Sequence, residues 1–325
     1  MAAITIIVGV VGCIGYFFLS NTILDSVYPA RGPNAGANIN RANQIRPWLF
    51  LFPALILLTV YLVYPVFVSI WLAFMDADGE KFVGLDNFVW MVGDVKFRES
   101  MINNMLWLII VPTLSTLMGL IAAAVTDRIR WGNIAKAMIF MPMAISMIGA
   151  AVIWKLVYEF RDADQAQIGI LNSIAVGLGR EPQTWLTVPY WNSLLLMIVL
   201  VWVQTGFAMV ILSAALRGIP EETIEAAIID GATPFQVFMK IKVPQIWGTI
   251  LVVWTTITIT VLKVFDVVYA MTNGQWGSQV LANLMYDWMF RANDSGRASA
   301  VALVIMLLVT PVMIWNIRNA RKEMR

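Results

Sequence analysis

The sequence predicts an all-α membrane protein with seven spans, six of them in a C-terminal core. Hydrophobic residues make up 60% of the 325 residues and charged residues 13%, whereas soluble domains carry roughly 25% charged residues. Apolar runs recur along the chain, and each is about 20 residues or longer, the length that a helix needs to cross a bilayer. The polar stretches between them hold the Gly, Pro and charged residues typical of loops.

The first predicted span lies in an extra N-terminal segment, residues 1–27. No basic residue precedes Arg31, so this segment lacks the basic start of a signal peptide, and we interpret it as a retained transmembrane helix. Residues 28–47 are rich in Gly, Pro and Asn and carry three arginines, which predicts a cytoplasmic linker.

The remaining six spans are predicted within residues 48–325. They are expected at residues 48–75, 102–125, 134–158, 190–216, 246–271 and 298–317. The outer loop 159–189 contains an apolar segment, 168–178, that is too short to cross a membrane. We expect this segment to form a helix at the outer interface.

Residues 217–244 form the longest polar interruption that still has helical patterning. Pro220 suits the start of a helix, and Gly231 tolerates the positive φ angle that often follows a helix end. Thr233 can cap a second helix, which Pro244 is predicted to close. The loop is therefore predicted to fold as helix, tight turn and helix.

The distribution of basic residues predicts the orientation of the chain. Placing residues 217–244 in the cytoplasm puts most of the 22 Lys and Arg residues on the cytoplasmic side. These include the C-terminal group Arg318, Arg321, Lys322 and Arg325. The N-terminus is then periplasmic and the C-terminus cytoplasmic.

Loop 217–244 resembles the "EAA" loop of the permease subunits of bacterial ATP-binding-cassette (ABC) importers. The matching residues are Glu225, Ala226, Ala227, Asp230, Gly231, Ala232, Phe238, Ile241 and Pro244. In that family the loop is a coupling helix that seats in a cleft of an ATPase subunit. The resemblance implies a six-helix, type I importer permease core with one extra N-terminal helix. A helix lying on lipid is the alternative, and the nearly neutral charge of the loop argues against it.

Further stretches resemble carbohydrate permeases. Residues 83–88 (VGLDNF) resemble a "GLxNF" segment, and residues 265–272 resemble the "FD…LT" segment that ends the fifth core span. Residues 273–277 (NGQWG) depart from the usual GGP, so we expect a different turn there. Together with residues 286–292, this region most resembles alpha-glucoside permeases. The resemblance covers residues 48–325 and implies an alpha-glucoside or another glycoside or oligosaccharide as cargo.

Polar and aromatic residues on two spans are candidates for a sugar cavity, because sugars present both hydroxyl groups and C–H faces. The candidates are Trp202, Gln204, Phe207, Thr256, Thr260, Lys263 and Asp266. Lys263 and Asp266 are three positions apart on the span 246–271, so we expect them on one helical face, with ion pairing favoured.

Composition excludes several other functions. The chain has no His and one cysteine, Cys13, within an apolar run, which predicts no metal site and no catalytic centre. A net charge of +2 is too small to indicate a nucleic-acid partner. The alternative that stays open is an ion-coupled secondary transporter in which Lys263 and Asp266 relay an ion.

The leading prediction is the membrane subunit of an ATP-driven carbohydrate importer in the bacterial inner membrane. The motif GxxxxGK[ST] is absent from the sequence, so we expect no cofactor in this chain and ATP with Mg bound by separate subunits. The resemblance implies four kinds of partner besides lipid. They are a second, different permease subunit, two ATP-binding subunits, an extracytoplasmic sugar-binding protein and the carbohydrate itself.

Overall fold

The computed structural model describes residues 1–162 and 164–323, and in this part of the chain the secondary structure is helical apart from an isolated bridge between Met75 and Phe82. Arg325, one of the basic residues used to predict orientation, lies outside the described residues. Five helices are long and apolar enough to cross a membrane, and counting each of two bent helix pairs as one span gives up to seven. The predicted all-α class and the predicted number of spans agree with this count.

Contacts divide the chain into two units, Met1–Ser69 and Ile70–Arg325. In the first unit, α1 (Ala2–Val27) packs against α2 (Ala35–Leu58). The side chains of Asp25 and Arg46 form an ion pair at 2.7 Å, and the Tyr16 hydroxyl donates to the carbonyl of Leu49. A π-helical turn then leads into α3 (Tyr64–Leu72), which crosses the boundary between the units.

The linker between the first two helices is shorter than the predicted 28–47. Residues 35–47 are helical and belong to α2. Their Ala, Gln and Arg residues favour a helix, and this preference outweighs the neighbouring Asn and Gly residues that suggested a loop.

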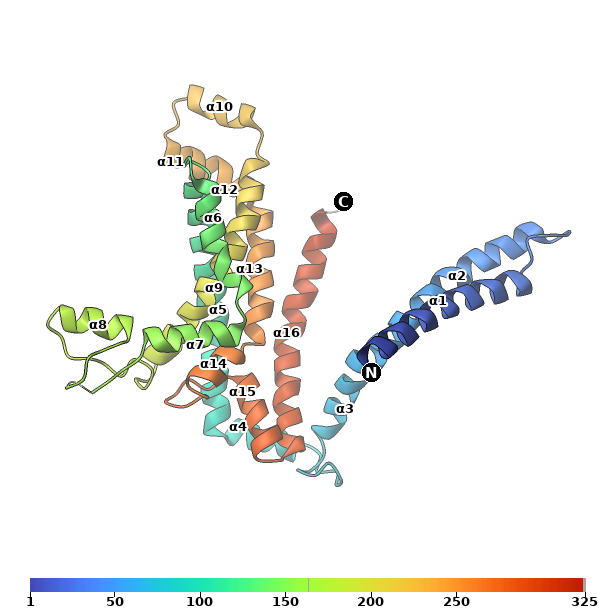
Figure 1. The fold of residues 1–325 in the computed structure, drawn as a ribbon, viewed down its shortest axis with the longest axis horizontal. Coiled ribbons are helices and arrows are strands. Elements are labelled where there is room, and N and C mark those ends of the chain that lie inside the picture. Colours follow the sequence, from blue (N-terminus) through green and yellow to red (C-terminus); the bar gives the residue numbers. More distant parts are fainter. Residues whose placement is uncertain (163, 324–325) are drawn as a thin grey trace. The chain divides into compact units, whose positions relative to one another are not determined.

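Two long helices, α5 (Val95–Thr126) and α9 (Trp191–Arg217), form the centre of the second unit (Figure 1). A Cβ atom built on Gly119 would lie 2.4 Å from the Cβ of Ala208, so the two backbones come closer than any larger residue would allow. Gly206 of α9 likewise lies close to the backbone of α6 (Gly132–Phe140), because a Cβ atom built on Gly206 would lie 2.7 Å from the carbonyl oxygen of Ile139. These close contacts fix α9 against both neighbouring helices.

Two predicted spans are broken. Residues 134–158 were expected as one span, but α6 and the turn after it meet α7 (Met147–Val157) at 104°. Pro142 lies in that turn, and Ser146 caps α7 by accepting the N–H of Gly149 at 3.1 Å.

The predicted span 246–271 is broken as well. The helix α13 (Trp247–Leu262) ends within the predicted span, and residues 263–265 lead from it into the short helix α14 (Asp266–Met271). A 69° bend also separates α13 from residues Pro234–Gln245.

The GLxNF segment joins the start of the second unit to its last long helix, α16 (Ser295–Glu323). Asn87, at the start of α4 (Asp86–Gly93), is buried and donates to the carbonyl oxygens of Ala73 (3.0 Å) and Met75 (2.7 Å). A Cβ built on Gly296 would lie 2.3 Å from that same Met75 carbonyl. The motif therefore has a structural role as a latch.

The predicted outer-loop helix is present as α8 (Ile170–Gly177). The buried side chain of Asn172 ties the loop together by donating to the carbonyls of Glu159 (2.9 Å) and Gln183 (3.0 Å). It also accepts the indole N–H of Trp185 at 2.9 Å. A lipid-interface position for α8 stays a prediction.

Candidate functional site

Residues 217–244 fold as the predicted helix, turn and helix. The first helix, α10 (Glu221–Ile229), is followed by Gly231 at φ +82°, and the N–H of Gly231 and that of the next residue bond back to carbonyls of the last helical turn, both at 3.0 Å. Thr233 and Gln236 form a reciprocal capping box at the start of α11 (Pro234–Val237). The second helical segment continues past Pro244, which lies in its last turn, and ends at Gln245.

This loop exposes large apolar side chains. Ile229 is 85% exposed and Phe235 is 73% exposed, and Ile228 and Met239 are exposed as well. Of the residues matched to the EAA loop, Ala227 is buried and Ala232, Phe238 and Ile241 are partly buried. Those that are exposed are Glu225, Ala226, Asp230, Gly231 and Pro244. Adjacent exposed apolar residues of this size mark a surface for a partner.

A polar cluster lies where α9 ends and the loop begins. The carboxylate of Asp127, which follows α5, accepts from the ammonium of Lys136 on α6 and from the buried Ser213 hydroxyl of α9 at 3.0 Å. Lys136 also donates to the Ser213 oxygen at 2.8 Å. Sequence reasoning missed this cluster, because its members are far apart along the chain and no local pattern connects them.

Among the described residues, the members of the predicted sugar cavity differ in burial and in their contacts. Trp202 and Phe207 pack against the core, and Trp202 makes an edge contact with Trp154 at 5.8 Å. Gln204 is buried. The hydroxyls of Thr256 and Thr260 donate to carbonyls of their own helix at 2.8 and 3.2 Å. Their contact with a substrate stays a prediction.

The expectation for Lys263 and Asp266 is wrong in its geometry. Lys263 is the residue after α13 and Asp266 begins α14, so the break between them removes the shared helical face. Both residues are exposed, and the ion pairs among the described residues do not join them. Lys263 instead lines a largely apolar pocket of about 400 Å³ with the aromatic residues Phe265 and Tyr286.

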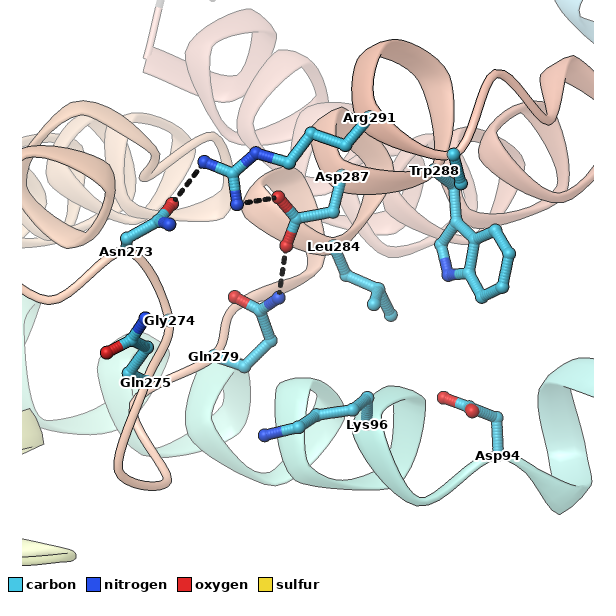
Figure 2. A pocket seen from close by; sticks show the side chains of 11 residues that line it. Asp94, Lys96, Asn273, Gly274, Gln275, Gln279, Leu284, Asp287, Trp288 and Arg291 are labelled. Atoms are coloured by element: carbon cyan, nitrogen blue, oxygen red, sulfur yellow. Dashed lines mark hydrogen bonds and ion pairs between the residues drawn. The ribbon is translucent and has the colours of Figure 1, made fainter.

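A larger pocket, of about 520 Å³, lies among the start of α5, residues 273–279 and the segment after α15 (Leu281–Tyr286). Figure 2 shows a chain of interactions along one side of it: Gln279 donates to Asp287 at 2.9 Å, Asp287 pairs with Arg291 at 2.9 Å, and Arg291 donates to Asn273 at 2.9 Å. In Figure 1, α4 and α15 lie at the end of the second unit opposite α10.

A bundle of helices long and apolar enough to cross a membrane, with a folded loop exposed at one end, is the architecture of a multi-pass membrane protein. The chain belongs to the family described as "Binding-protein-dependent transport system inner membrane component", which matches residues 115–322. It is therefore a membrane subunit of an ABC importer, and the leading prediction is confirmed at this level.

Two relatives align over most of the chain. The alpha-glucoside transport system permease protein AglF of Rhizobium meliloti is 64% identical, and the alignment covers 99% of this chain and 97% of the relative. The osmoprotective compounds uptake permease protein GgtC of Synechocystis is 46% identical, with 85% and 99% covered.

A solved structure shares the fold. A subunit of a bacterial ABC transporter involved in the import of the acidic polysaccharide alginate superposes with a TM-score of 0.74 at 19% identity, covering 86% of this chain and 98% of the other. This likeness concerns the fold alone, and it confirms the predicted fold class, the helical fold of an importer permease.

Proposed function

We propose that this subunit imports an alpha-glucoside or a related glycoside or oligosaccharide, driven by ATP hydrolysis in separate subunits. The 64% identity to an alpha-glucoside permease over 99% of the chain carries this proposal. The GxxxxGK[ST] motif is absent from the sequence, so ATP and Mg are assigned to partner subunits.

The loop 217–244 is the proposed docking element for an ATPase subunit. Its exposed apolar residues supply the contact area, and the exposed carboxylate of Glu225 adds a polar contact beside them. The turn at Gly231 and the capping box at Thr233 hold the two helices in one arrangement, so a push on α10 moves the loop as a unit.

The polar cluster of Asp127, Lys136 and Ser213 lies next to the loop along α9 and joins that helix to α5 and α6. A displacement of the loop would therefore reach three helices together. The close backbone contacts at Gly119 and Gly206 support the same transmission, since they leave little room for sliding.

The transport path is proposed to pass the break after α13. Exposed charges such as Lys263 and Asp266 would cost about 2.5–3.5 kcal/mol in lipid, so they are expected to face water, cargo or a second subunit. The proposed assembly contains a second permease subunit, two ATP-binding subunits and an extracytoplasmic sugar-binding protein. The N-terminus is proposed to be periplasmic, and the C-terminus and the loop cytoplasmic.

Uptake measurements in the host bacterium test this function. Deleting the gene should abolish uptake of labelled maltose, trehalose or methyl alpha-glucoside, and restoring it should recover uptake. Uptake should continue after a protonophore collapses the proton gradient and should stop when ATP is depleted. Loss of uptake with the protonophore while ATP is preserved would instead support the ion-coupled alternative.

A further inference from the structure

We call the pocket of about 520 Å³ the outer pocket, because the proposed orientation puts the end of the unit opposite α10 on the extracytoplasmic side (Figure 1). It combines the two segments that most resemble alpha-glucoside permeases. Residues 273–275 of the first segment form one wall, and residues 286–292 supply Asp287, Trp288 and Arg291 to another (Figure 2). Its volume of about 520 Å³ lies within the ~300–1,000 Å³ range of small-molecule sites. The two segments and the start of α5, which is distant in the sequence, thus meet around one space large enough for a sugar.

Three of the four charged side chains that line this pocket are in ion pairs. Asp287 pairs with Arg291, and Lys96 pairs with Glu99 at 3.0 Å. Asp94 uses one carboxylate oxygen to accept the N–H of Phe97 at 2.7 Å. Paired charges give little net attraction for an ion, but they leave donors and acceptors for a neutral ligand rich in hydroxyl groups.

Groups that could contact such a ligand line the pocket. Gln275 is exposed and offers both a donor and an acceptor. Lys96 and Asp94 lie on the side of the pocket opposite the interacting residues Gln279, Asp287 and Arg291 (Figure 2). Trp288 supplies an aromatic surface. It is held by an edge contact with Trp90 at 4.8 Å and by the Arg297 guanidinium, which lies over the ring 4.8 Å from its centroid. Aromatic and planar polar side chains together suit the C–H faces and hydroxyls of a saccharide.

The backbone beside the pocket has an unfavourable conformation at Trp276. Its φ of +54° is one that a bulky residue rarely adopts, whereas Asn273 and Asn293, at +52° and +51°, tolerate this region better. Buried amides fix this arrangement: Asn192 donates to the carbonyl of Trp276, and Asn103 donates to that of Gly277, both at 2.8 Å. Strained residues that their surroundings hold in place cluster at ligand sites.

We propose that this pocket is a receiving subsite, which binds a neutral saccharide at the extracytoplasmic mouth before the sugar enters the membrane path. The inference rests on the proposed carbohydrate transport and on the outer location opposite α10. Gln275, Lys96 and Asp94 provide the hydrogen bonds, and Trp288 provides the apolar face.

Cysteine protection tests the subsite. Cys13 is the only cysteine, so a Cys13→Ser background makes Ala292→Cys, at the exposed edge of the pocket, the sole thiol of the chain. The assembled transporter in native membranes would be labelled with a membrane-impermeant maleimide, with and without maltose or trehalose. At a sugar concentration ~10 times its Kd, labelling should slow about tenfold.

Three controls make the result specific. Ala77→Cys, an exposed outer residue that does not line the pocket, should be labelled at the same rate with and without sugar. Sorbitol, an open-chain polyol, should give no protection. Adding Gln275→Ala to the Ala292→Cys variant should remove the protection by sugar.

The outcomes separate this proposal from the proposed function. Normal glycoside uptake without protection at Ala292→Cys overturns the subsite and leaves the transport function standing. Absence of glycoside uptake by the native chain overturns the transport function. If protection instead requires the extracytoplasmic sugar-binding protein and occurs with or without sugar, the pocket is a docking surface for that protein, and the subsite is overturned.

Discussion

Replacing Gly231 with valine should uncouple the loop from the ATPase without preventing membrane insertion. Gly231 has a φ angle of +82°, and a Cβ atom built there would meet nothing within 4 Å. The penalty is therefore conformational, because a side chain at positive φ costs about 1–2 kcal/mol and a β-branched one is among the worst. This corresponds to a factor of roughly 5–30 in the population that keeps the native turn.

The assay compares uptake with assembly. We expect the initial rate of glycoside uptake in Gly231→Val to fall by about 5–30-fold while the amount of membrane-inserted, assembled complex stays near that of the native chain. Gly231→Asn should retain more activity, since Asn tolerates the left-handed region better than valine.

A second glycine in the same loop provides the matched control. Gly218 has a negative φ, and a Cβ built there would lie 3.4 Å from the nearest atom, the carbonyl oxygen of Ala215, so Gly218→Ala should keep most of the uptake. Full uptake in Gly231→Val, or an equal loss in Gly218→Ala, would refute the argument from turn geometry.

Three further predictions concern the packing. Asp127→Asn should lower the thermal unfolding temperature of the detergent-solubilised complex, with a loss of roughly 1.5–3 kcal/mol for a charge-assisted bond, and Lys136→Met should add little further loss in the double variant. Strict additivity of the two losses would contradict a shared contact. Asn87→Ala should cost about 1–3 kcal/mol, seen in the same melting assay, because it leaves buried carbonyls unpaired, and unchanged melting would argue against the latch. Gly119→Val should reduce the yield of folded protein sharply by overpacking, whereas Gly177→Ala, with open space around it, should not.

The elements that the sequence predicted well are those determined by local chemistry. Apolar runs located the spans because transfer into lipid depends on composition. The loop was predicted from Pro220, Gly231 and Thr233, each of which acts on its own few neighbours, and the structure has the expected start, turn and cap. The resemblance to the EAA loop identified the same segment.

The elements that could not be predicted depend on direction or on distant contacts. The breaks near Ser146 and at residues 263–265 interrupt apolar sequence, and hydropathy carries no information about where a chain turns. The cluster at Asp127 and the outer pocket join residues from separate helices, so their partners appear only once the helices are packed. Lys263 and Asp266 were paired on the assumption of a continuous helix.

The interruption at residues 263–265 has a consequence for what can surround this subunit. At this break the N–H groups of Lys263 and Val264 still bond to the carbonyls of Thr260 and Val261, but the regular helical ladder stops and leaves the charges of Lys263 and Asp266 exposed beside it, and hydrocarbon tails offer neither group a partner. This side of the subunit is therefore unsuited to lipid and needs protein or water against it. A single copy alone in a bilayer would expose these polar groups to lipid.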